Sequence, residues 1–96
     1  HQESHEAIAE VAKFAYMVHF KDFKPEPEGY GGFAYTTIQG EKVIGTAVGE
    51  GSVDLERCIK ELKDAGFDGW LSVEYEGDED PLTAVRRSIE NAKKYL

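Results

Sequence analysis

The sequence is poor in the features that mark secreted and membrane-bound proteins. It has one cysteine, Cys58, which excludes an internal disulfide and is typical of a protein in a reducing cytoplasm. No apolar run approaches the ~20 residues of a transmembrane helix, and the first residues do not resemble a signal peptide. We therefore expect a cytoplasmic protein. Because the sequence lacks an initiator methionine, we also expect it to begin within a longer gene product.

Basic residues are scarce as well. The 96 residues include 11 Lys and Arg but 19 Asp and Glu, so the formal net charge is −8. This charge repels phosphate backbones and anionic membrane surfaces, so neither nucleic acid nor a membrane is an expected partner. The length suits one small domain, residues 1–96, whereas a closed eight-stranded α/β barrel needs about 250 residues.

The pattern of apolar residues predicts helices that alternate with strands. Helical spacing occurs in residues 3–13, 55–65 and 81–96, and short runs of branched and aromatic residues occur in 14–20 and 70–75. Such alternation is typical of an α/β fold with a parallel sheet.

Two of these helices have clear capping residues. Ser52 or Asp54 caps the middle helix, which ends at Gly66, and Asp80 caps the last helix. The expected buried faces are Leu55, Ile59 and Leu62 in the middle helix and Leu82, Val85, Ile89, Ala92 and Leu96 in the last helix.

A long excursion, residues 23–48, separates the first strand from the middle helix. Its first ten residues contain five helix-breaking residues and predict a loop: Pro25, Pro27, Gly29, Gly31 and Gly32. Residues 33–38 and 43–48 predict either a β-hairpin or irregular extended chain. A tight turn follows at Gly49-Glu50-Gly51.

Each of the two main strands carries one polar side chain that suits a functional site. Alternation puts the apolar residues on one face, which we expect to pack against helices: Tyr16, Val18, Phe20, Leu71, Val73 and Tyr75. The opposite face carries His19 and Glu74, each at the C-terminal end of its strand, where the active sites of α/β barrels lie. An imidazole and a carboxylate suit Mn²⁺, Co²⁺, Zn²⁺ or Mg²⁺. Two ligands are too few for a stable site, so we expect others from elsewhere.

Four motifs follow one another along the chain: His19-Phe20-Lys21-Asp22, Gly49-Glu50-Gly51 with Val53-Asp54, Leu62 to Gly69, and Trp70 to Glu76. Together they resemble the C-terminal part of the xylose-isomerase-like barrel superfamily. That superfamily includes sugar and sugar-phosphate isomerases and epimerases, inosose dehydratases and endonuclease-IV-like repair enzymes. The resemblance implies an incomplete (β/α)8 barrel, of which this chain supplies strands six to eight with their helices. The strand before Lys21 would be the sixth and the strand from Trp70 the eighth.

The resemblance also implies roles for two residues. In the isomerase and epimerase branch, His19 would bind the metal, and Glu74 would bind the metal and act as the catalytic acid/base. The other two acidic ligands would lie on earlier strands, outside this chain. The implied reaction is proton transfer next to the carbonyl group of a small sugar or sugar phosphate. The alternative is a non-catalytic half-barrel, which would associate with itself or with an upstream half because its sheet edges and inner face are open.

Several other residues allow two interpretations. Lys21 and Asp22 either contact substrate or form an ion pair that orients the end of the strand. Tyr30, Phe33 and Tyr35 either cover a bound sugar or pack together as a local cluster. An endonuclease-IV-like hydrolase is disfavoured, because that branch has an Asp and a His before its G-x-G turn, and residues 45–48 contain neither.

Overall fold

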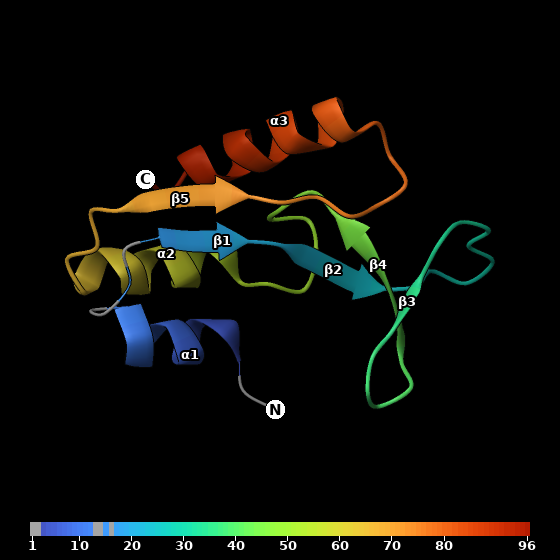
Figure 1. Cartoon of the computed structure of the whole chain (residues 1–96), viewed down its shortest axis with the longest axis horizontal. Coiled ribbons are helices and arrows are strands. Elements are labelled where there is room, and N and C mark those ends of the chain that lie inside the picture. Colours follow the sequence, from blue (N-terminus) through green and yellow to red (C-terminus); the bar gives the residue numbers. More distant parts are fainter. Residues whose placement is uncertain (1–2, 13–14, 16) are drawn as a thin grey trace.

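The computed structural model describes residues 3–12, 15 and 17–96, arranged as an α/β fold with two separate small sheets (Figure 1). The elements, in chain order, are α1 (Ser4–Val11), β1 (Met17–Phe20), β2 (Asp22–Pro25), β3 (Tyr35–Thr36), β4 (Lys42–Thr46), α2 (Leu55–Asp64), β5 (Trp70–Val73) and α3 (Pro81–Lys93).

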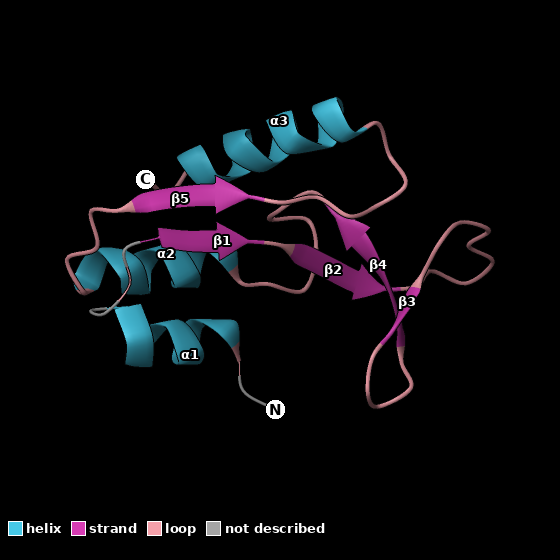
Figure 2. Cartoon of the chain, in the orientation of Figure 1, coloured by secondary structure: helices cyan, strands magenta, loops and turns pink. Residues whose placement is uncertain are grey.

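The strands β1 and β5 form a parallel pair, with Met17 opposite Trp70 and Phe20 opposite Val73 (Figure 2). The backbone N–H of Glu74 donates to the carbonyl of Phe20 at 2.8 Å, so the pairing continues one residue beyond β5. The connection between these strands includes α2, as parallel neighbours require a crossover. The parallel pair therefore has the arrangement of two consecutive strands in an α/β barrel.

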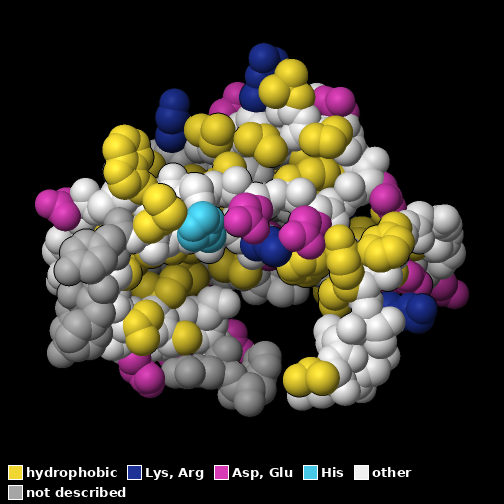
Figure 3. Space-filling model, viewed as in Figure 1, with side chains coloured by type: hydrophobic (Ala, Val, Ile, Leu, Met, Phe, Trp, Pro, Cys, Tyr) yellow, Lys and Arg dark blue, Asp and Glu magenta, His cyan; other side chains and the backbone are white. Residues whose placement is uncertain are grey.

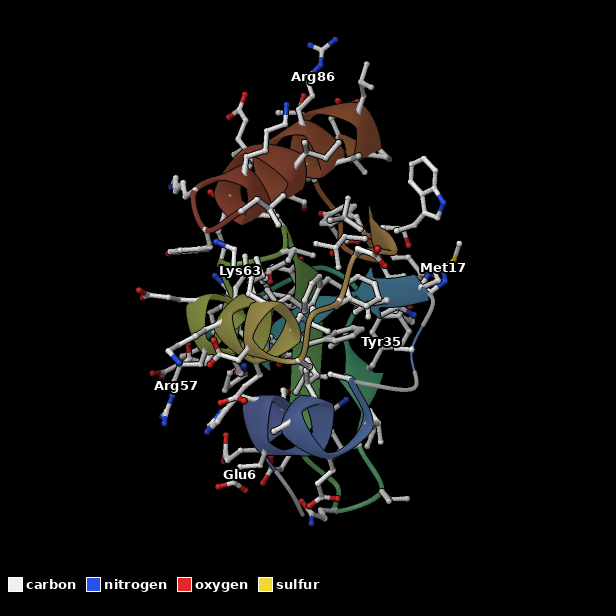
Figure 4. The ribbon with its side chains drawn as sticks, turned by 90° about the vertical axis from the view of Figure 1, so that its left-hand side faces the viewer. Glu6, Met17, Tyr35, Arg57, Lys63 and Arg86 are labelled. Atoms are coloured by element: carbon white, nitrogen blue, oxygen red, sulfur yellow. The ribbon has the colours of Figure 1, made fainter. Side chains whose placement is uncertain are left out.

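The hydrophobic core lies on one face of this pair. It is formed mainly by α2 and by the apolar face of the strands, with buried Ala12, Phe20, Val48, Leu55, Cys58, Ile59, Leu62 and Ala92. Val18, Leu71 and Val73 pack against this core, which confirms the expected face for these residues and Phe20, whereas Tyr16 lies outside the described residues and Tyr75 lies beyond β5, outside this core. The opposite face is open: Met17 is 52% exposed and Trp70 is 76% exposed. Figure 4 shows Met17 on the side of the strands away from α2.

The direct pairing of β1 with β5 corrects one part of the expected topology. A sixth and an eighth strand would have another parallel strand between them, and none lies there. The stretch that would have supplied it, β4, instead pairs antiparallel with β2 and β3 in the second sheet. Among its described residues the chain therefore has two directly paired parallel strands and no third parallel strand between them, and which barrel strands they are stays a prediction.

The excursion is more ordered than its composition predicts. The expected hairpin is confirmed, because β3 and β4 are antiparallel and flank a turn at Gly40 with φ +86°. The expected loop from residue 23 is wrong at its start, since β2 pairs with β4 through Asp22 to Pro25. Pro25 is tolerated because β2 is an edge strand of the order β2-β4-β3, where one missing donor leaves the ladder intact.

The helix ends follow the expected capping residues. The Asp54 carboxylate accepts the N–H of Arg57, and the Asp80 carboxylate accepts the N–H of Thr83. Gly66, at φ +76°, follows the end of α2 in a conformation that favours glycine. These contacts confirm both N-caps and the stop signal that the sequence predicts.

The buried face of α3 differs from the expected apolar stripe. Its buried residues are Ala84, Ser88 and Ala92, whereas Leu82 and Ile89 are exposed. A hydrogen bond explains this difference. The N–H of Val48 donates to Ser88 Oγ at 2.8 Å, so the face of α3 that carries Ser88 and the small alanines packs against the backbone at Val48. Of the five expected residues, Ala92 is buried and Val85 half-buried, while Leu82, Ile89 and Leu96 lie on the outside.

Candidate functional site

A row of polar side chains crosses the open face at the C-terminal ends of β1 and β5. The register puts His19 opposite Ser72, and Glu74 follows directly after β5. Figure 3 shows this row as a histidine next to acidic and basic side chains, with hydrophobic side chains on both sides. The two residues that the sequence predicts as metal ligands are therefore brought together by neighbouring parallel strands.

The side chains of His19 and Glu74 are in direct contact at the strand ends. His19 Nδ1 and Glu74 Oε1 lie 3.2 Å apart. Two neighbouring ligand atoms, each about 2.1 Å from the same ion, are roughly 3.0–3.4 Å apart in octahedral or tetrahedral geometry. Both side chains are about half exposed, so a ligand can reach them from the open face. The pair fits two positions of a divalent-metal site.

These two side chains do not complete a metal site by themselves. Within residues 3–12, 15 and 17–96, no group of three or more His, Cys, Asp or Glu side chains is arranged to hold a metal ion. A catalytic site with one open position normally needs three protein ligands. That earlier strands supply further ligands stays a prediction.

Lys21 joins the row through two carboxylates. Its ammonium nitrogen is 2.6 Å from Glu76 Oε1 and 3.2 Å from Glu74 Oε2. These carboxylates, Glu76 first, raise the pKa of Lys21, and Lys21 in turn lowers the pKa of Glu76. Lys21 therefore remains protonated at neutral pH and points a cationic donor into the row. Its ion pairs are with these glutamates, and the expected pair with Asp22 does not form.

Asp22 is not part of the row; its buried side chain stabilises the fold. Its side chain is 1% exposed, and its carboxylate accepts backbone N–H groups of Phe23, Gly49, Gly51 and Val53, all at 3.0 Å. The backbone N–H groups of the turn at Gly49-Glu50-Gly51 are thus bound by a carboxylate of the same chain. Contact between Asp22 and substrate has no support in this arrangement.

Ser72 and Glu76 are members of the row that lie within the motif Trp70 to Glu76 but were not predicted as site residues. Ser72 Oγ is 2.8 Å from His19 Nδ1, the same nitrogen that faces Glu74, so this hydrogen bond and coordination of a metal through Nδ1 exclude one another. Strand alternation would have identified Ser72, because it shares a face with Glu74. Glu76 lies beyond β5, where alternation no longer applies, so only the contact with Lys21 reveals it.

The aromatic residues of the excursion pack as a cluster next to this row. Tyr35 makes edge-to-face contacts with Phe33 and Phe23, at centroid distances of 4.8 and 5.6 Å. Partial burial, and then the Glu76 carboxylate, raise the pKa of Tyr35, so its hydroxyl stays protonated and lies near the row. Tyr30 makes no ring contact with this cluster among the described residues; its hydroxyl donates a hydrogen bond of 2.5 Å to the Asp78 carboxylate. Local packing thus accounts for Phe33 and Tyr35, and Tyr35 also borders the candidate site through Glu76.

The fold and the row define an α/β protein with barrel-type parallel strands and a polar site at their C-terminal ends. The family model described as xylose isomerase-like TIM barrel matches residues 1–95 of the 96-residue chain. The chain belongs to this family. A search of curated proteins finds no match to the chain. No helix in the described part of the chain is long and apolar enough to cross a membrane.

Proposed function

We propose that this chain is the C-terminal portion of a divalent-metal-dependent sugar or sugar-phosphate isomerase or epimerase. In this proposal β1 and β5 are the seventh and eighth barrel strands, and the earlier strands supply the remaining ligands. The observation that supports it best is the separation of 3.2 Å between His19 Nδ1 and Glu74 Oε1 at adjoining strand ends. Membership in the xylose isomerase-like family supports the same class of reaction.

In this proposal each side chain of the row has a separate role in the transfer of a proton from and to the carbon next to a carbonyl group. A divalent cation (Mn²⁺, Mg²⁺, Co²⁺ or Zn²⁺), when bound, polarises the carbonyl and hydroxyl oxygens of the sugar. His19 and Glu74 would hold this ion, and binding through His19 Nδ1 would replace the 2.8 Å hydrogen bond between that nitrogen and Ser72 Oγ. Glu74 would also accept and return the carbon-bound proton, together with a second carboxylate on an earlier strand.

Lys21 and the aromatic cluster would prepare the site for this chemistry. Lys21 holds the second oxygen of Glu74 at 3.2 Å, which fixes the carboxylate and offsets negative charge that develops nearby. Phe33 and Tyr35 would exclude water from one side of the sugar and offer ring faces to its C–H groups. The sugar itself would be selected by walls that other strands contribute.

The experiment uses the complete enzyme that this proposal requires, with this chain as its C-terminal portion. His19→Ala and Glu74→Gln are each expected to lower bound metal or turnover by more than about tenfold. Metal content is measured by mass spectrometry, and turnover is followed as exchange of the sugar proton for deuterium by NMR. The exposed Glu90→Gln, on α3, is the matched control and should change neither quantity. Full metal content and full exchange in both site variants would contradict the proposal.

A second candidate is a non-catalytic half-barrel that works by association. It is favoured by the open face, where Met17 and Trp70 expose apolar side chains to solvent. Either a second copy or an upstream half would cover this face. The third candidate, an endonuclease-IV-like hydrolase, is not supported by the fold. Ala47 and Val48, which precede the Gly49 turn, are buried and apolar and offer no side-chain metal ligand.

A further inference from the structure

The Lys21 ammonium lies between two carboxylates of the row. Its nitrogen is 3.2 Å from Glu74 Oε2 and 2.6 Å from Glu76 Oε1, and Figure 3 shows a basic side chain beside two acidic ones within the row. Both glutamates belong to the segment that follows β5, whereas Lys21 directly follows β1. The contact therefore joins the ends of the two parallel strands, at the end where His19 also lies.

The two oxygens of the Glu74 carboxylate face different neighbours. Oε1 lies 3.2 Å from His19 Nδ1, and Oε2 lies 3.2 Å from Lys21 Nζ. A carboxylate that bridges two metal ions binds one with each oxygen, and the ions of two-metal sites are about 3.5–4 Å apart. The Lys21 ammonium is therefore at the place that a second ion, bound to Oε2, would take.

Lys21 and a second divalent ion would compete for the same carboxylate oxygens. Such oxygens bind Mg²⁺ at about 2.1 Å and Ca²⁺ at about 2.3–2.6 Å, so an ion shared by Glu74 Oε2 and Glu76 Oε1 would overlap the ammonium nitrogen. The positive charge of the ammonium also repels an ion nearby, and salt screens this repulsion little at separations well below the Debye length. A second ion can bind only where Lys21 has been displaced.

We propose that Lys21 limits this strand end to a single divalent ion, because its ammonium is the resident cation of Glu74 and Glu76. Oε1 of Glu74, next to His19, is then the carboxylate oxygen left for the metal. Glu76 is a positioning residue in this arrangement, since it holds Lys21 against Glu74. The role of Lys21 rests on the proposed function, because it concerns the ion that His19 and Glu74 would hold.

Mn²⁺ binding to the 96-residue chain, measured by EPR of the free ion, tests this role. Wild type should bind Mn²⁺ weakly, and His19→Ala should abolish this binding. Lys21→Met removes the ammonium and should bind Mn²⁺ about tenfold more tightly, because the ion then reaches both carboxylates without repulsion. In the Lys21→Met background, His19→Ala should no longer abolish binding, whereas Glu76→Gln should restore the dependence on His19.

Two control variants separate the position of Lys21 from its charge. Lys21→Arg keeps the positive charge at this position and should behave like wild type. Lys42→Met, at an exposed position of β4, removes the same charge elsewhere and should also behave like wild type. Unchanged amide signals of β1 and β5 show that a variant keeps the fold. Equal Mn²⁺ affinity of Lys21→Met and Lys42→Met would overturn the proposal, as would tight binding by Lys21→Arg.

The same titrations distinguish the role of Lys21 from the proposed function. Absence of Mn²⁺ binding in wild type, together with binding by Lys21→Met through Glu74 and Glu76, would support the role of Lys21 and remove the support for a metal at His19. Binding in wild type that depends on His19, with no gain in Lys21→Met, would leave the proposed function in place and show that Lys21 does not exclude a second ion.

Discussion

The Asp22 carboxylate lies directly against the backbone of Gly51, and a side-chain carbon at Gly51 would collide with it. The Gly51 N–H donates to Asp22 Oδ2 at 3.0 Å, as does the N–H of Gly49. Because Asp22 joins β1 to the second sheet and Gly51 precedes α2, this contact ties the excursion to the rest of the fold.

The first prediction concerns this buried anchor. Asp22→Asn should lower the free energy of unfolding by about 2–3 kcal/mol, because an amide nitrogen replaces one acceptor and faces backbone donors. Urea unfolding measures the change, and Asp68→Asn, at an exposed position, is the control. An unchanged stability together with lost substrate binding would instead assign Asp22 to the substrate site.

The second prediction concerns pH. Arg87 lowers the pKa values of Glu50 and Glu79, so these pairs stabilise the fold above the ordinary carboxyl range, and this stabilisation is lost as pH falls through the lowered values. Arg87→Gln should lower the free energy of unfolding slightly at neutral pH, since all three side chains are partly exposed, and change it hardly at all in strong acid.

The measurement for this second prediction is urea unfolding of wild type and Arg87→Gln at both pH values. Arg86→Gln, on the same helix, is the control, since Figure 4 shows Arg86 pointing away from the molecule. An equal loss of stability at both pH values would show that Arg87 acts through packing and not through its ion pairs.

A third prediction concerns metal affinity of this chain alone. Titration calorimetry with Mn²⁺ or Co²⁺ should show weak binding that His19→Ala abolishes, because His19 and Glu74 provide only two ligands. The same experiment with His5→Ala is the control. A tight one-to-one site on a monomer would mean that this chain holds the full ligand set.

The fourth prediction concerns the open face. Met17 and Trp70 expose large apolar side chains, each of which forgoes roughly 1.5–3 kcal/mol of burial. The isolated chain should therefore self-associate with rising concentration, as sedimentation would detect. Trp70→Ser should weaken association, whereas Leu82→Ser, an exposed apolar residue on α3, is the comparison. A stable monomer at all concentrations would remove the support for the half-barrel alternative.

The sequence was sufficient where local chemistry decides the structure. Asp54 and Asp80 cap their helices as expected, since a side chain and a backbone N–H three residues away meet in any helix of this kind. Alternation assigned His19 and Glu74 to one face because successive strand side chains always point to opposite sides. Their joint position at the strand ends followed from that alternation and from the family resemblance.

Only the tertiary structure decided which segments became neighbours. The pairing of β1 with β5, the exclusion of β4 from that sheet, and the buried face of α3 depend on hydrogen bonds between distant segments. Asp22 is a further example. Its position in the sequence, close to His19, suggested a role in substrate binding. In the folded chain its carboxylate instead accepts four backbone N–H groups, three of them from residues distant in the sequence. Periodicity along the chain describes the faces of each element, but partners are chosen by satisfying backbone donors and acceptors across the whole fold.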